Sequence, residues 1–147
     1  MQSFTIYNSN LKPSEAQKSE VVDFLHNHLG EYGDPKAHIL KCLEYAICEN
    51  NSSPGGFALL IKDKNTTQGI TIVNKTGMSG YIPENILVYI AVNENNRGKG
   101  IGKSLMKKAI ELADGDIALH VEPDNSAKFL YEKLGFSSKY LEMRLKK

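Results

Sequence analysis

The hydrophobic positions of this chain change their spacing several times, and each change marks a new element. Residues 86–92 form one unbroken apolar run of mostly β-forming residues, which is typical of a strand covered on both faces. Further along, apolar residues recur at helical spacing, at Ile101, Leu105, Ala109 and Leu112. The sequence therefore predicts a buried strand that leads, through a short polar loop, into an amphipathic helix.

Two helices and three strands are predicted before this strand. Ser14 and Gln17 form a capping-box pattern that opens a helix ending near Leu29. Asp34-Pro35 suits the N-cap and first position of a second helix, which carries apolar residues as far as Ile47. Short apolar runs predict strands at residues 4–7, 57–62 and 68–73.

After the amphipathic helix the pattern alternates again. A further strand is predicted at 117–121, and a short helix runs from Ala127 to Leu134, where Gly135 stops it. The alternation from Tyr140 to Leu145 predicts a final edge or hairpin strand. The predicted order is β-α-α-β-β-β-α-β-α-β, which indicates one domain over residues 1–147, of the α/β (α+β) class, with a mixed sheet flanked by helices.

A glycine-rich loop, Arg97-Gly98-Lys99-Gly100-Ile101-Gly102-Lys103, joins the strand at 86–92 to the helix. Glycines leave backbone amides uncovered, and the first amides of a helix lack partners at the positive end of its dipole. Three basic side chains add positive charge, so the pattern predicts a phosphate site. A P-loop would need a glycine at position 97, and a dinucleotide fingerprint would place its third glycine one residue after Gly102. A glycine-rich turn without a ligand is the alternative interpretation.

Two segments resemble the signatures of the GNAT superfamily of N-acetyltransferases. Arg-Gly-x-Gly-x-Gly, leading from a strand into a helix, resembles the acetyl-coenzyme A loop, and Leu130 to Phe136 resembles the second signature. The predicted element order is also that of the GNAT fold, whose mixed sheet is mostly antiparallel. The resemblance implies transfer of an acetyl group from acetyl-coenzyme A, as cosubstrate, to an amine by direct attack in a ternary complex, without a metal.

The resemblance also implies which residues bind the cofactor. Main-chain groups at the end of the central strand would bind the pantetheine arm, and amides of the glycine-rich loop would bind the pyrophosphate. The implied strand residues are Ile90, Ala91 and Val92, and those of the loop are Arg97, Gly98, Lys99, Gly100, Ile101, Gly102 and Lys103. Asn125 lies one residue from the position of the family asparagine, where Asp124 stands, so the pantetheine contact is open between these two residues.

Tyr131 matches the family tyrosine whose hydroxyl lies near the thioester sulfur, and its implied role is to protonate the leaving thiolate. The general base is open between two residues. His120 occupies a position where some relatives use a strand carboxylate, and an imidazole titrates near neutral pH. Glu84, just before the central strand, would act through an ordered water. Each of these three residues also has an ordinary structural interpretation, in the core or on the surface.

The acceptor is expected to be a small-molecule or peptide amine. Glu31 and Asp34, between the first two predicted helices, could attract a cationic amine that Tyr32 covers, although such residues are also common in loops. A homodimer is expected from the resemblance alone. A non-catalytic protein that holds acyl-coenzyme A as a sensor or scaffold is the alternative function.

Composition limits the other classes of partner. The 147 residues are 41% hydrophobic and 24% charged, with a net charge of +1, as in ordinary globular proteins. No apolar run approaches the roughly 20 residues that span a bilayer, so no membrane association is expected. The first residues lack the pattern of a signal peptide, which predicts a cytoplasmic location. No stripe of Lys and Arg with interleaved aromatic residues indicates nucleic-acid binding.

Overall fold

The computed structural model describes residues 2–50 and 52–147, and within them five strands form one sheet in the order β1-β2-β3-β4-β5. Adjacent strands are antiparallel except β4 and β5, which are parallel. This arrangement confirms the prediction of a mixed, mostly antiparallel sheet. The strands are β1 (Gln2–Tyr7), β2 (Gly56–Asp63), β3 (Thr66–Lys75), β4 (Asn85–Val92) and β5 (Ile117–Leu119).

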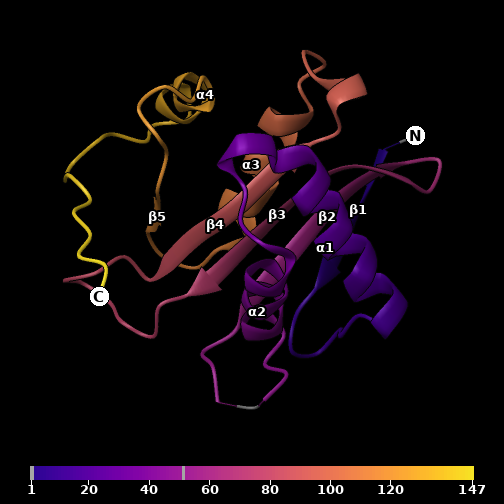
Figure 1. Ribbon diagram of the computed structural model, residues 1–147, viewed down its shortest axis with the longest axis horizontal. Helices are drawn as coiled ribbons and strands as arrows, with labels where there is room; N and C mark the ends of the chain where they lie inside the picture. Colours follow the sequence, from indigo (N-terminus) through magenta and orange to yellow (C-terminus); the bar gives the residue numbers. More distant parts are fainter. Residues whose placement is uncertain (1, 51) are drawn as a thin grey trace.

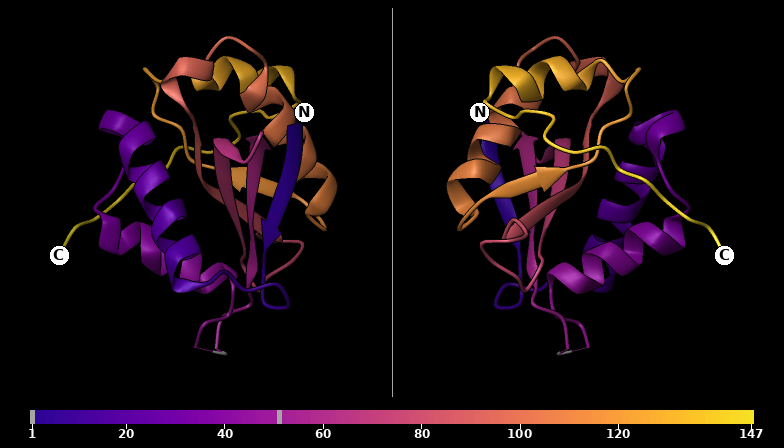
Figure 2. Two further views of the ribbon diagram at one scale, coloured as in Figure 1. Left: turned by 90° about the vertical axis from the view of Figure 1, so that its right-hand side faces the viewer. Right: turned by 90° about the vertical axis from the view of Figure 1, so that its left-hand side faces the viewer.

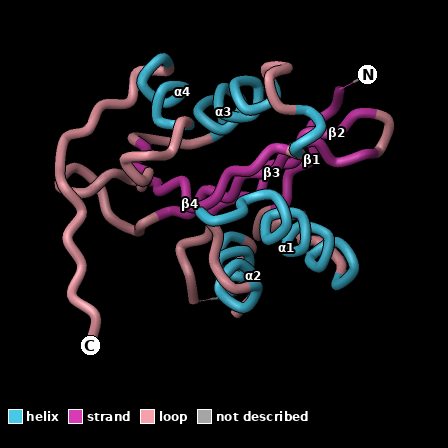
Figure 3. Tube along the Cα trace, turned by 45° about the horizontal axis from the view of Figure 1, so that its top comes forward, coloured by secondary structure: helices cyan, strands magenta, loops and turns pink. Residues whose placement is uncertain are grey.

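Helices cover both faces of the sheet (Figures 1 and 2). Helices α1 (Glu15–Leu29) and α2 (Lys36–Ala46) lie on one face, and α3 (Ile101–Leu112) and α4 (Ala127–Lys133) on the other, as the tube in Figure 3 also shows. Short 3₁₀ turns, η1 (Gly30–Tyr32) and η2 (Glu94–Asn96), follow α1 and β4. Because side chains alternate along each strand, the core consists of two clusters, one on each face of the sheet.

The capping signals at the two N-terminal helices have different outcomes. The Gln17 amide donates to Ser14 Oγ at 3.2 Å and the Ser14 amide donates to Gln17 Oε1 at 2.8 Å, which confirms the capping box of α1. The prediction for α2 is wrong by one residue, since Pro35 is the N-cap and no side chain caps the helix. The Asp34 carboxylate is thereby free to bond elsewhere, and it accepts a hydrogen bond from Tyr89.

Strand β4 carries a bulge where it separates from β5. Tyr89 lies opposite Ile72 and Leu87 opposite Val73, so Val88 is the extra residue on β4. Strand β5 pairs only with Asn85, Ile86 and Leu87. Within the described part of the chain, β4 therefore has no strand partner on the β5 side from Val88 to Val92.

Two expectations for the C-terminal region are wrong. Strand β5 ends at Leu119 instead of continuing to residue 121, and residues 140–145 adopt no regular secondary structure. Tyr140, Leu141, Met143 and Leu145 are 81% to 90% exposed. A segment of alternating apolar and polar residues forms a strand only where a neighbouring strand makes hydrogen bonds with its backbone. This segment instead extends away from the sheet (Figure 2).

None of the helices in the described residues is long and apolar enough to cross a membrane.

Candidate functional site

The glycine-rich loop ends in an uncapped helix N-terminus. Gly98 and Gly100 have φ of +81° and +76°, in the left-handed region that glycine favours, and Gly100 is the N-cap of α3. The first helical hydrogen bond runs from the Ser104 amide to the Gly100 carbonyl at 3.0 Å. Within the described residues, no acceptor is found for the amides of residues 101–103. These donors lie at the positive end of the helix dipole and suit an anion.

Side chains around the loop attach it to three other elements. The Arg97 guanidinium donates to the His28 carbonyl at 3.1 Å, at the end of α1, so much of its charge is directed there. Lys99 and Lys103 are exposed. At Gly102, an added Cβ would lie 3.5 Å from Leu130 on α4 and 3.7 Å from Val92 on β4. The first turn of α3 therefore lies close to the second signature segment on α4 and to the end of β4.

The free edge of β4 leads to this loop. The Asn93 amide donates to the Gln68 carbonyl on the β3 side at 2.8 Å. Since backbone groups of successive strand residues point to opposite edges, those of Ala91 also face β3, whereas those of Ile90 and Val92 face the side where β5 has ended. Of the three predicted strand residues, Ile90 and Val92 therefore present amides and carbonyls at the free edge.

Tyr131 lies on α4 beside this edge. Its side chain is 7% exposed and belongs to the core cluster against which Ile90 and Val92 pack. Its ring meets that of Phe136 edge-on, with 6.1 Å between the ring centroids. The hydroxyl has no hydrogen-bond partner within the described residues, and burial raises the pKa of Tyr131. The phenol is therefore protonated at neutral pH and available as a donor.

Asn125 and Asp124 occupy different environments just before α4. Asn125 Oδ1 accepts from the Ala127 amide at 3.0 Å, so its carboxamide closes a turn just before α4, whose N-cap is Ser126. Its Nδ2 group has no partner within the described residues and can donate to a ligand. Asp124 is exposed. Partial burial and then the charge of Asp124 raise the pKa of Tyr32, on the turn after α1, so these two loops lie near each other.

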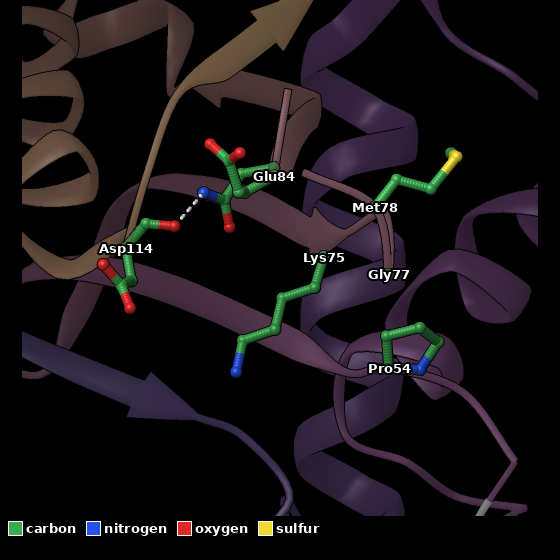
Figure 4. A pocket seen from close by; sticks show the side chains of 7 residues that line it. Pro54, Lys75, Gly77, Met78, Glu84 and Asp114 are labelled. Carbon is green, nitrogen blue, oxygen red and sulfur yellow. Dashed lines mark hydrogen bonds between the residues drawn. The ribbon is translucent and has the colours of Figure 1, made fainter. Parts of the chain in front are cut away.

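The two candidate bases lie in different parts of the molecule. His120 directly follows β5 and is exposed, on the same side of β4 as the free edge. Glu84 lies at the opposite end of β4, beside a cavity of about 220 Å³ that Asp114 and Lys75 also line (Figure 4). Its carboxylate accepts from the Asp116 amide at 2.7 Å and the Gly80 amide at 3.2 Å. These hydrogen bonds lower the pKa of Glu84, and the structure does not bring it to the loop.

Sequence reasoning missed the contact between Tyr89 and Asp34. The Tyr89 hydroxyl donates to Asp34 Oδ2 at 2.5 Å. Burial and then the hydrogen bond to Asp34 raise the pKa of Tyr89, so the phenol remains the donor. The available signal was the one polar side-chain atom in the apolar run at residues 86–92, since a buried tyrosine hydroxyl usually needs a partner.

Comparisons with known proteins agree with this geometry. Residues 43–138 match the family model described as acetyltransferase (GNAT) domain. Aminoglycoside N-acetyltransferase AAC(6')-Iy, solved in complex with coenzyme A, superposes with a TM-score of 0.72 at 13% identity, over 100% of this chain and 95% of that one.

Two further solved structures share the fold. A ribosomal-protein-alanine N-acetyltransferase from Brucella melitensis biovar Abortus has a TM-score of 0.66 at 16% identity, with 99% of each chain covered. An aminoglycoside acetyltransferase from an uncultured soil metagenomic sample has a TM-score of 0.69 at 18% identity, covering 99% of this chain and 98% of that one. No curated protein sequence matches this chain.

Proposed function

The chain belongs to the GNAT acetyltransferase family, whose members are acetyl-coenzyme A-dependent acyltransferases, and from this premise we propose that it acetylates an amine by direct attack within a ternary complex. One observation carries the proposal: the unpaired edge of β4 leads directly into the uncapped N-terminus of α3. An extended, amide-containing ligand that ends in phosphates matches this sequence of donors.

In this proposal the cofactor lies along β4. The pantetheine amides pair with the backbone of Ile90 and Val92, as an added strand would. The pyrophosphate accepts from the amides of residues 98–103, with Lys99 and Lys103 adding charge, whereas the Arg97 amide already donates to the Glu94 carbonyl at 3.5 Å. Asn125 donates through Nδ2 to a pantetheine carbonyl, because its Oδ1 already accepts from Ala127. An ionised Asp124 has no proton to donate there.

The proposed reaction has two steps. The amine nitrogen attacks the thioester carbonyl carbon, which forms the C–N bond and moves the π electrons onto oxygen. The intermediate then collapses, the C–S bond breaks, and its electrons leave on sulfur. Tyr131 gives its proton to this thiolate and regains one from solvent, while the nitrogen releases its extra proton to water. The products are the acetylated amine and coenzyme A.

The amine must be neutral before it attacks, although most alkylamines are ammonium ions at neutral pH. We assign His120 as the group that accepts this proton, because it follows β5 on the side of the free β4 edge and its imidazole is exposed. Glu84 does not take this role in the proposal. Its two carboxylate oxygens are already held by backbone amides at the other end of β4.

The test is coenzyme A release from acetyl-coenzyme A in the presence of amines. The panel contains mono- and diamines, an aminoglycoside and short peptides with a free N-terminus, and products are identified by mass. We expect thiol release that depends on the amine and yields an acetylated amine in equal amount. A protein that binds acetyl-coenzyme A but releases no thiol with any amine would be the acyl-coenzyme A sensor instead.

A further inference from the structure

Tyr89 connects the reacting edge of β4 to the loop between α1 and α2. Its ring belongs to the core cluster under α1 and α2, on the face of the sheet opposite α3, and the side chain is only 8% exposed. Its hydroxyl donates to Asp34, an exposed residue that precedes α2. A buried group of β4 thereby fixes the position of a surface carboxylate.

This carboxylate is held close to the point where β4 separates from β5. Tyr89 is adjacent to Ile90 in sequence and follows the bulge at Val88, where β4 separates from β5. The glycine-rich loop and α3 lie on one face of β4. The loop that contains Asp34 lies at the edge of the opposite face, which α1 and α2 cover, and Tyr32 in the same loop lies near Asp124, just before α4.

The negative charge of Asp34 is not compensated within the described residues. Lys36, two positions away, pairs instead with Asp23 at 3.0 Å. No Lys, Arg or His lies within ion-pair distance of Asp34 in the described part of the chain. Tyr89 occupies Oδ2, whereas Oδ1 has no partner there and can accept a hydrogen bond from a ligand. An oriented carboxylate of this kind prefers an ammonium donor.

We propose that Asp34, positioned by Tyr89, binds a second ammonium group of the acceptor and so selects diamines and polyamines over monoamines. This inference rests on the proposed function. The length of the Tyr89 side chain separates Asp34 from the strand, so the carboxylate contacts an ammonium several bonds away from the nitrogen that is acetylated. Asp34 is a specificity-determining residue in this scheme, and Tyr89 is a positioning residue.

Putrescine and butylamine test this selection, because they share a four-carbon chain and differ in the second amine. We expect wild-type kcat/KM to be on the order of 10-fold higher for putrescine, as for a hydrogen bond between charged groups. Asp34→Asn preserves an acceptor for Tyr89 and removes the charge. It should raise KM for putrescine by about the same factor, with kcat and the affinity for acetyl-coenzyme A unchanged.

Tyr89→Phe should reduce the preference for putrescine by a smaller factor, because Asp34 keeps its charge and loses its fixed position. Asp23→Asn, which removes an exposed carboxylate paired with Lys36, is the charge-matched control and should keep the wild-type preference. Equal loss of activity toward both amines in Asp34→Asn would mean a structural role and would overturn the proposal.

The wild type distinguishes failure of this inference from failure of the proposed function. If its kcat/KM for butylamine or for peptides equals that for putrescine, the inference is wrong and the acetyltransferase function stands. If it acetylates other amines of the panel but neither of these two, the inference is also wrong. If no amine causes thiol release, both are wrong.

Discussion

The two ends of β4 differ in how many hydrogen-bonding groups nearby are free to bind a ligand. At the C-terminal end, the amides of residues 101–103 and the edge groups of Ile90 and Val92 have no partners in the described residues. At the N-terminal end, the carboxylate of Glu84 accepts from two backbone amides. Both ends carried predicted site residues, but the Glu84 carboxylate is already bonded, whereas the other end has backbone donors without partners in the described residues. A charged residue near a strand end is thus a site candidate only when its partners are known.

The largest expected loss of cofactor affinity comes from a substitution in the glycine-rich loop at the N-terminus of α3. Gly100→Asp places a carboxylate at the N-terminus of α3, where it would occupy the phosphate position and repel the cofactor. We expect acetyl-coenzyme A affinity to fall by on the order of 100-fold or more, measured by calorimetry. Gly80→Asp is the matched control, since both glycines have φ of +76°, which strains an L-residue, and an added Cβ meets no atom within 4 Å at either position. Equal loss of affinity in the two variants would contradict the phosphate placement.

A smaller effect is expected from the proton donor. Tyr131→Phe should lower kcat by roughly 10- to 100-fold, at or below the usual range for a general acid, because a thiolate is a good leaving group. Cofactor affinity should change little. Burial raises the pKa of Tyr131, so the alkaline decline of wild-type kcat should lie above the ordinary tyrosine value of about 10 and be absent in the variant. Unchanged turnover would remove Tyr131 from the mechanism.

Asn125→Asp separates the two functions of the carboxamide. The variant keeps an oxygen that accepts from the Ala127 amide but loses the Nδ2 donor, so acetyl-coenzyme A affinity should fall by about 3- to 10-fold, the range for one neutral hydrogen bond. Asp124→Asn should change the affinity by less than about two-fold, because Asp124 is exposed. A larger loss in the Asp124 variant would assign the pantetheine contact to that residue.

The smallest effect on activity is expected at the other end of β4. Glu84→Gln should leave kcat within about two-fold of the wild type and lower the melting temperature. Because the two amides lower its pKa, Glu84 stabilises the fold above its ordinary pKa of 4.5, and this contribution is lost as the pH falls through the lower folded value. The melting temperature of the variant should therefore differ from wild type at pH 7 and converge with it in acid. A large loss of kcat with unchanged stability would restore Glu84 as the base.

Most of the fold could be predicted because periodicity and capping are local signals. The capping box of Ser14 and Gln17 and the change of spacing around residues 93–101 each depend on neighbours in sequence. The prediction of a strand from Tyr140 to Leu145 failed because strand pairing needs a free edge on a distant strand. Alternation of apolar and polar residues does not show whether such an edge is free. The predicted extension of β5 to residue 121 failed for the same reason.

The candidate site was predictable where it depends on the backbone. The spacing of Gly98, Gly100 and Gly102 anticipated an uncovered helix N-terminus. The alternatives at Asn125 and Glu84 could not be resolved, since they depend on which hydrogen bonds each side chain makes in the fold. The pairing of Asp34 with Tyr89 joins residues 55 positions apart, and no local pattern indicates it.

Calorimetric titration of the wild-type protein with acetyl-coenzyme A tests the central claim most directly, with ATP and NAD as controls. The open end of β4 offers both phosphate donors and a strand edge for the pantetheine arm. We therefore predict saturable binding of acetyl-coenzyme A with one site per chain, and much weaker binding of ATP and NAD, which contain pyrophosphate but no pantetheine. Equal affinity for all three ligands, or no binding of acetyl-coenzyme A, would contradict the claim that the cofactor lies along β4.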